Sequence, residues 1–460
     1  MTVIDTTTAD FAVLAARCDG RVLTPQHPDY DTARGAFNVT VDQRPAAVVF
    51  PIHEGDVAAV VAFAAEAGLQ VAAQGTGHNA GPLGDLGATI LLRTNAMKGV
   101  EIDAAQRTVR VGAGVVWEDV IGPAAAAGLA TLHGSSPDVG VVGYCLGGGM
   151  GWYARKFGLA ANHVTAIELV TADGKHLRAT HEQEAELFWA LRGGGGNFGV
   201  VTAIELRLFP VTEVYAGVLF FDASRAAEVL HAWNALLPGL PEEMTSVGRL
   251  LQMPPAPDVP LPLRGRSFVV IEAAYLGSRT GGEALLAPLR ALGPDVDTFA
   301  MLPPEELAEL HMDPRDPMPV ASAHALLDAL PADGIDALLA AAGPDANSPL
   351  VSVELRHTGG ALARSADHHG ARDTLPGSLA LFALGVPADP AAGAAVAAGL
   401  AAVSAALEPW AVGFYPNFVE QPFATERAFR AETWARLRAV KAARDPEDRF
   451  RGNHPAGPQR

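Results

Sequence analysis

The 460-residue sequence has little cysteine and comparatively little basic charge, and each shortage excludes a class of protein. Only Cys18 and Cys145 occur, too few for a disulfide framework and suited to a reducing cytoplasm. Lys and Arg number 33 against 51 Asp and Glu, a net charge of −18, and no basic patch for nucleic acid is visible. Met1 to Asp10 lack the basic and apolar regions of a secretory signal. No uninterrupted apolar run approaches the ~20 residues of a membrane span. We therefore expect a cytoplasmic protein that binds neither nucleic acid nor a membrane.

Length and pattern then predict the domains. A chain of 460 residues is too long for one core, and apolar runs alternate with short helical patterns up to about Pro210. One such helix is expected over Glu54 to Ala67, ended by Gly68. Later runs such as Val351 to Arg356 are separated by apolar helices, which is typical of an antiparallel sheet covered by helices. An amphipathic helix is expected over Thr425 to Lys441. We expect domains at 1–210 and 211–412, with 413–460 returning to the first domain.

A histidine lies inside a loop suited to anions. The apolar run Leu69 to Ala73 leads into Gln74-Gly75-Thr76-Gly77-His78-Asn79. Glycines that alternate with small polar residues after a strand leave backbone N–H groups free to converge on a phosphate. Such a nest needs no imidazole, so His78 calls for a separate explanation.

Two glycine clusters give a second signal. They span Gly140 to Gly151 and Gly193 to Gly199. Glycine costs about 0.5–1 kcal/mol inside regular structure, so the clusters indicate either close approach of a flat or anionic ligand or tight turns. A Rossmann site is disfavoured, because the first cluster follows no clear strand and no acidic residue lies at the required offset. His368 and His369 lack a third ligand at metal spacing, so we predict no metal site.

Six segments in the same order resemble the berberine-bridge-enzyme-like FAD-linked oxidases of the vanillyl-alcohol-oxidase superfamily, in their bacterial branch. The segments are Gln74-Gly75-Thr76-Gly77-His78, Gly134-Ser135-Ser136-Pro137-Asp138-Val139-Gly140, Gly147-Gly148-Gly149-Met150-Gly151-Trp152, Arg155-Lys156-Phe157-Gly158-Leu159-Ala160, Leu187 to Val201, and the C-terminal Tyr415-Pro416-Asn417-Phe418 with Asp445-Pro446 and Phe450-Arg451-Gly452-Asn453. The resemblance implies an α+β fold. It comprises a PCMH-type FAD-binding domain of two α/β subdomains and a substrate domain whose antiparallel sheet is covered by helices.

The resemblance also implies the cofactor and its attachment. His78 would form a covalent bond to the flavin 8α-methyl, as a neutral imidazole can near pH 7. Cofactor-binding residues would be His78, Gln74, Gly75, Thr76, Gly77, Asn79, Ser135, Pro137, Val139, Gly140, Gly143, Tyr144, Gly148, Gly151, Trp152, Asn162, Val200, Val201, Tyr415, Asn417 and Asn453.

Three positions depart from the family pattern. Many members add a second link through a cysteine where this chain has Ser136, so we predict a single tether; Cys145 is expected to pack as a small apolar residue. Ala161-Asn162-His163 replaces Ser-Asp-Asn, and Asn162 can still bond the cofactor. Phe418 stands where relatives carry a tyrosine that deprotonates the substrate.

A general base must therefore come from elsewhere, unless the substrate is an amine that loses hydride as its free base. Ser352, Glu354 and Arg356 alternate on a predicted strand and share one face. Glu354 and Arg356 are our candidate acid/base and orienting pair, against the alternative of a surface ion pair. Tyr144 is a third candidate. His357 is expected to be structural.

The prediction is an FAD-dependent oxidase that takes hydride from a C–H next to an alcohol or amine of a hydrophobic secondary metabolite, with dioxygen as acceptor and hydrogen peroxide as product. The partners would be that substrate and dioxygen, and the protein a monomer or homodimer. Two alternatives remain at this point: an oxidative cyclase or desaturase of the same fold, and a non-catalytic protein that binds flavin or a metabolite.

Overall fold

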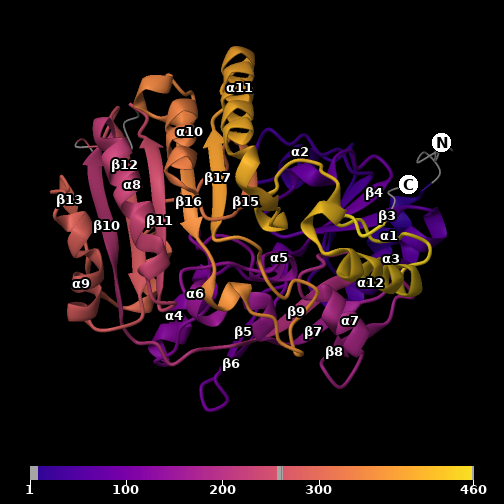
Figure 1. The fold of residues 1–460 in the computed structure, drawn as a ribbon. Coiled ribbons are helices and arrows are strands. Elements are labelled where there is room, and N and C mark those ends of the chain that lie inside the picture. The colour runs from indigo at the N-terminus through magenta and orange to yellow at the C-terminus, as the bar shows by residue number, and fades with distance from the viewer. Residues whose placement is uncertain (1–8, 256–258, 260, 262, 458–460) are drawn as a thin grey trace.

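Three sheets, formed by successive parts of the chain, organise the computed structural model, which describes residues 9–255, 259, 261 and 263–457 (Figure 1). The expectation that Met1 to Asp10 carry no secretory signal concerns mainly residues 1–8, which lie outside the described residues. The fold is α+β, as predicted, with mixed and antiparallel sheets and helices beside them.

The first sheet carries the nest that contains His78. Its strands β2, β4 and β3 are parallel, and β1 pairs antiparallel with β2. Helix α3 has the predicted bounds. His53 Nδ1 accepts the Asp56 N–H at its start, and Gly68 ends it at φ 69°, a left-handed conformation that glycine adopts without strain. In sheet order the strands are β1 (Arg21–Leu23), β2 (Ala47–Phe50), β4 (Thr89–Arg93) and β3 (Gln70–Gln74), with helices α1 (Phe11–Arg17), α2 (Tyr30–Ala33) and α3 (Glu54–Ala67).

The second sheet is antiparallel throughout. The α/β alternation expected up to Pro210 therefore holds for the first sheet only, because hairpins and not helical crossovers join several strands of the second. In order the strands are β5 (Val100–Asp103), β6 (Thr108–Gly112), β9 (Val200–Arg207), β7 (Val164–Val170) and β8 (His176–Ala179), with helices α4 (Glu118–Ala126), α5 (Val141–Gly147), α6 (Ala154–Phe157) and α7 (Ala185–Leu191).

The third sheet, built from chain beyond Val214, is antiparallel and has helices on one face (Figure 1). A separate apolar core that includes Trp233 and Ile335 fills the space beneath those helices. In order the strands are β13 (Val296–Asp297), β10 (Val214–Asp222), β12 (Ser267–Tyr275), β11 (Met244–Gln252), β16 (Ser352–His357), β17 (Leu379–Gly385), β15 (Ala321–Leu327) and β18 (Ala411–Gly413), with β14 (Ala300–Leu302) on β10 and helices α8 (Ala226–Leu236), α9 (Arg279–Arg290), α10 (Ala332–Ala342) and α11 (Pro390–Leu407). The opposite face of its central strands turns toward the other two sheets.

Helix α11 corrects one sequence expectation. The helical segment Pro390–Trp410 has a mean hydropathy of 1.7 over its most apolar window, enough by length and composition to cross a membrane. Only 22% of that window is buried, and Val396, Leu400, Val403 and Leu407 form its buried side. The alanines between them hide the segment from a search for long runs of large apolar residues.

The C-terminal segment lies beside the first sheet, and in Figure 1 its yellow ribbon runs next to the indigo elements. Val71 N–H donates to Arg449 O, and Arg451 N–H donates to Val71 O, so this segment continues the edge of β3. The preceding helix, α12 (Ala431–Arg444), starts later than predicted. A separate 3₁₀ turn (Thr425–Ala428) and the extended Arg430 replace the expected first turns of one helix.

Candidate active site

A cavity of about 880 Å³ lies between the glycine-rich loops of the first two sheets and the open face of the third. One end is lined by Gly75 to Asn79 and by Gly193 to Gly196, and the other by side chains of β11, β16 and β17. Asn453 and His454 of the C-terminal segment close one wall. Three stretches of chain that are distant in sequence therefore build one continuous space.

His78 sits at the wall of this cavity with a fixed ring. Its Nδ1 lies 2.8 Å from Thr76 Oγ1, and its ring stacks on Phe37 at 3.9 Å between centroids. Its Nε2 faces Asp138 Oδ2 at 3.4 Å. The nest therefore presents an imidazole in a single orientation to whatever fills the cavity.

The glycines of the two clusters differ in what surrounds them. A Cβ added at Gly140, Gly143 or Gly196 would meet nothing within 4 Å. All three line the cavity, so their lack of a side chain enlarges it. In contrast, a Cβ at Gly151 would lie 1.9 Å from the His133 carbonyl oxygen, so packing alone requires that glycine.

The cavity fits a large polar cofactor such as FAD. Several buried polar atoms of lining residues have no hydrogen-bond partner among the described residues, and each such atom is costly unless a bound group satisfies it. They are Gln74 Oε1 and Nε2, Asn79 Oδ1, Thr425 Oγ1 and Arg451 Nε. Together with the glycine walls, they form a cradle whose polar groups await a partner.

A buried charged network lines the other end. Glu354 Oε1 accepts from Arg356 Nε at 2.7 Å, and its Oε2 lies 2.9 Å from His311 Nε2. His311 Nδ1 contacts Glu272 Oε2 at 2.5 Å, and the other oxygen of Glu272 lies 2.7 Å from Arg249 Nη2. The four side chains other than Arg356 are at most 5% exposed, and that of Arg356 is 14% exposed. β16 and β11 are register neighbours, which brings charges from separate strands into contact.

The network fixes the protonation states. Burial and Arg249 lower the pKa of His311, but Glu272, Asp313 and Glu354 outweigh them and raise it to about 9. Burial alone would raise the pKa of Glu354, yet Arg356, His311 and Arg249 hold it well below its usual range. At pH 7 the cluster therefore contains three cations and three carboxylates when Asp313 is included, and no net charge.

Most of the predicted cofactor residues line the cavity, and six do not: Pro137, Gly148, Gly151, Trp152, Asn162 and Val200. Each of three has a structural reason. Gly148 leaves room for the Tyr415 ring. Asn162 bonds the backbone at Gly370, Arg372 and Asp373. Trp152 is buried against His311. Their predicted contact with the cofactor has no support in this geometry.

The structure places the candidate acid/base residues in different environments. Tyr144 lines the cavity, but its hydroxyl donates to Leu132 O at 2.9 Å, and burial keeps its pKa well above the ordinary value. We therefore assign Tyr144 to the wall. Glu354 and Arg356 do share the cavity face of β16, as predicted, but in a buried pair and not at the surface. His357 is structural, because its Nε2 lies 2.9 Å from Arg155 Nη1 on the opposite face.

Neither Ser136 nor Cys145 is placed to form a second covalent link to the cofactor. Ser136 Oγ donates to Asp313 Oδ2 at 2.6 Å, as does Ser135 Oγ at 2.8 Å. Cys145 is 1% exposed and does not line the cavity, and burial raises the pKa of its thiol. It packs as an apolar residue.

Sequence reasoning missed four of the six residues of the charged network. His311 and Asp313 come from an irregular, proline-rich segment with no periodicity, whereas Arg249 and Glu272 lie on strands and looked like ordinary alternation. Charged residues inside apolar β runs were the signal that could have found the last two.

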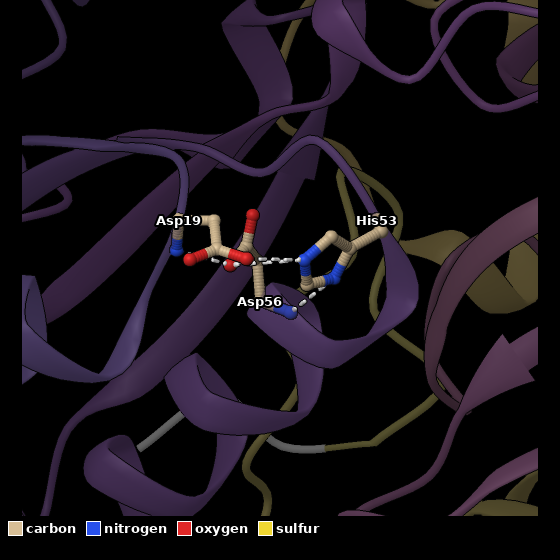
Figure 2. Close-up of side chains that lie close together, drawn as sticks. All are labelled: Asp19, His53 and Asp56. Atoms are coloured by element: carbon tan, nitrogen blue, oxygen red, sulfur yellow. Dashed lines mark hydrogen bonds and ion pairs between the residues drawn. The ribbon is translucent and has the colours of Figure 1, made fainter.

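A third group of ionisable side chains lies far along the chain from these residues. Asp19, His53 and Asp56 offer atoms within 4.8 Å of one another, at the start of α3 (Figure 2). The Asp56 carboxylate already accepts three backbone N–H groups, from Asp19, Gly20 and Ile52. His53 uses its Nδ1 to cap α3. This trio secures a loop to a helix, and its ligand atoms are committed to that work.

Comparison with known proteins agrees with this site. Residues 45–180 match the family described as "FAD binding domain". The chain is 29% identical to (R)-6-hydroxynicotine oxidase of Paenarthrobacter nicotinovorans, over 96% of this chain and 97% of that protein. It is 34% identical to glucooligosaccharide oxidase of Sarocladium strictum, over 40% of this chain and 38% of that protein.

Solved structures show the same fold. That of 6-hydroxy-D-nicotine oxidase from Arthrobacter nicotinovorans superimposes with a TM-score of 0.82 at 27% identity, covering 96% of this chain and 98% of that one. BBE-like 1 of Physcomitrella patens gives 0.83 at 20% identity, covering 98% and 100%, which bears on the fold alone. The cradle and these likenesses lead to one conclusion: the chain contains an FAD-binding domain over residues 45–180, is similar over nearly its whole length to hydroxynicotine oxidase, and is an FAD-linked oxidoreductase.

Proposed function

We propose that this protein oxidises a small apolar amine at the C–H next to nitrogen, with dioxygen as the final acceptor and hydrogen peroxide as the product. The observation that carries the proposal is the continuity of the cavity from the His78 nest to the Glu354 face of β16. When bound, FAD supplies the hydride acceptor. The protein's part is to hold that cofactor, place the substrate and set its protonation state.

The glycine-walled end of the cavity would hold the cofactor. Gly75, Gly140, Gly143 and Gly196 allow close approach, and Gln74 and Asn79 bring unpartnered polar atoms. His78 would carry a covalent bond to the 8α carbon. Ser136 would leave the attachment single, because its hydroxyl is committed to Asp313 and is a far poorer nucleophile than a thiolate.

The other end would orient the substrate. Phe382, Leu384 and Phe418 form an apolar wall, and Phe418 also lies 5.2 Å from the Arg356 guanidinium. Glu354 Oε2 is buried and has no well-aligned hydrogen-bond donor among the described residues. It would accept a hydrogen bond from a substrate N–H or O–H, which is worth about 1.5–3 kcal/mol for a charged acceptor.

Protonation favours an amine over an alcohol. Removing an alcohol proton near pH 7 requires a base with a pKa close to that pH. At the β16 end of the cavity, Glu354 has a strongly lowered pKa, the pKa of His311 is raised to about 9, and Phe418 has no ionisable group. A free-base amine needs no such group to give up hydride. The relative that matches over nearly its whole length is named for hydroxynicotine, which is itself an amine.

The experiment has two arms. The tether is tested by precipitating the purified chain with acid. Wild type should keep its yellow colour in the pellet and show the mass of one FAD less two hydrogen atoms, and His78→Ala should release all flavin. A colourless wild-type pellet would contradict attachment at His78.

The substrate arm mixes the enzyme anaerobically with matched amines and alcohols of equal carbon skeleton and follows the flavin absorbance. We expect bleaching by the amines, faster as pH rises toward the pKa of the amine, and peroxide release when air is admitted. Reduction by the alcohols alone would overturn the choice of substrate.

The two unpaired thiols, Cys18 and Cys145, support a reducing compartment, and we propose the cytoplasm.

A further inference from the structure

His78 has a carboxylate neighbour that the proposed function does not yet use. Asp138 follows Pro137 in the loop before α5, and its Oδ2 lies 3.4 Å from His78 Nε2. The side chains of Asp138 and His78 are 19% and 23% exposed. The pair is therefore largely shielded from water, where a charge acts strongly on its neighbour.

Among the described residues, the Asp138 carboxylate has few partners for a shielded anion. Its Oδ1 is buried with no hydrogen-bond donor, and the His78 contact serves its Oδ2. Burying a carboxylate with so little compensation is costly.

The geometry gives Asp138 a defined position relative to the cavity. His78 lines the cavity and Asp138 does not, so the carboxylate stands behind the imidazole. Phe37 holds the ring by stacking, and Thr76 Oγ1 lies at the other nitrogen, Nδ1, at 2.8 Å. The two ring nitrogens thus have different neighbours, an anion at Nε2 and a neutral hydroxyl at Nδ1.

We propose that Asp138 is a positioning residue for covalent attachment of the cofactor: it holds His78 as the Nε2–H tautomer, which leaves the Nδ1 lone pair to form the bond. This inference rests on the proposed tether at His78. A carboxylate behind a histidine fixes its tautomer and raises the basicity of the far nitrogen in other sites of this pattern. Thr76 would donate to Nδ1 until the cofactor carbon takes its place.

The step balances as follows. A bond forms between Nδ1 and the 8α carbon, while one C–H bond of the methyl group and the Nε2–H bond of His78 break. Asp138 accepts the Nε2 proton. Loss of the C–H and Nε2–H hydrogens releases two protons and two electrons in total. Dioxygen, the acceptor of the proposed reaction, takes up both and becomes hydrogen peroxide.

A second carboxyl near His78 provides the matched control. Glu420 also lines the cavity, and its Oε2 accepts from Ser322 Oγ at 2.7 Å. Burial raises the pKa of Glu420, with Ser322 and His78 opposing that rise. Because Glu420 has its own donor, we expect Glu420→Gln to leave attachment unchanged. The same change at Asp138 should slow it.

The test measures attachment separately from binding and from turnover. Full-length wild type, Asp138→Asn, Asp138→Glu and Glu420→Gln are produced in riboflavin-starved cells and mixed with FAD. Samples are quenched in acid over time, and the flavin in the pellet is counted. Quenching of flavin fluorescence before the acid step reports reversible binding. We expect Asp138→Asn to bind FAD with a Kd close to that of wild type and to attach it about 10- to 100-fold more slowly, with Asp138→Glu partly restored.

Chemical rescue distinguishes proton transfer from a merely structural effect. Added formate should accelerate attachment in Asp138→Ala and not in wild type, because a small carboxylate can enter the space of the missing side chain. Attachment by Asp138→Asn at the wild-type rate, equal slowing by Glu420→Gln, or no response of Asp138→Ala to formate would each overturn the inference. If wild type itself left all flavin in the supernatant, the tether at His78 would fail instead.

Discussion

The substitution Glu354→Gln tests whether the buried charges act as one balanced unit. Glutamine keeps the shape of the side chain and removes its charge. Glu354 is 1% exposed and holds Arg356 at 2.7 Å and His311 at 2.9 Å. Without its charge, three cations would face the two carboxylates of Glu272 and Asp313, and the cluster would carry one uncompensated positive charge.

Two effects set the cost. Breaking a buried ion pair by removing one partner destabilises by about 3–5 kcal/mol. The cluster could instead regain neutrality by releasing the His311 proton. Glu354 is one of the carboxylates that raise the pKa of His311 to about 9, so this release is easier in the variant than in wild type and keeps the loss at the lower end of that range. We therefore expect the variant to lose about 3 kcal/mol of unfolding free energy.

Urea unfolding at pH 7, followed by circular dichroism, measures this loss. The control is Glu66→Gln, which removes an ion pair with Arg17 whose side chains are 40% and 58% exposed. Exposed pairs contribute about 0–1 kcal/mol. A loss for Glu354→Gln no larger than that for Glu66→Gln would refute the reasoning that these charges depend on one another.

Two further predictions follow from the same site. The raised pKa of His311 contributes stability that is complete below the unfolded value of about 6.5 and is lost as pH rises through about 9; the urea midpoint of wild type should therefore fall more between pH 7 and pH 10 than that of His311→Gln, and parallel curves would contradict this. Gly143→Leu should weaken FAD binding, measured by fluorescence titration, because the new side chain would enter the cavity. It should not lower the melting temperature of the flavin-free protein. Gly151→Ala should instead lower the free energy of unfolding by about 1–3 kcal/mol, because the added Cβ would clash with the His133 carbonyl.

The sequence predicted best those parts of the fold that obey local rules. Helix α3 was placed to the residue because a capping turn and Gly68 mark its ends. The shared face of Ser352, Glu354 and Arg356 followed from the period of a strand alone, and all three line the cavity. The His78 nest was visible because glycine alternation after a strand is itself the local signal.

Other parts depend on tertiary contacts that leave no local trace. His311 joins the network only because the irregular segment after Leu310 folds over β12 and β16, and its partners lie 39 and 43 positions away in Glu272 and Glu354. Asn162 was predicted to bind the cofactor, yet it bonds a backbone some 210 positions later. Helix α12 starts at Ala431, because Arg430 is extended although the sequence pattern continues through it.

The strand-like pairing of Arg449 and Arg451 with Val71 has a consequence for the order of events during synthesis. A ribosome that has already made the His78 nest must add more than 370 residues before Asn453 and His454 can supply the last wall of the cavity. A nascent chain can therefore shape the nest early and still be unable to retain its coenzyme. A chain cut before Asn453 would lack that wall, and we expect it to hold FAD more weakly than the full chain.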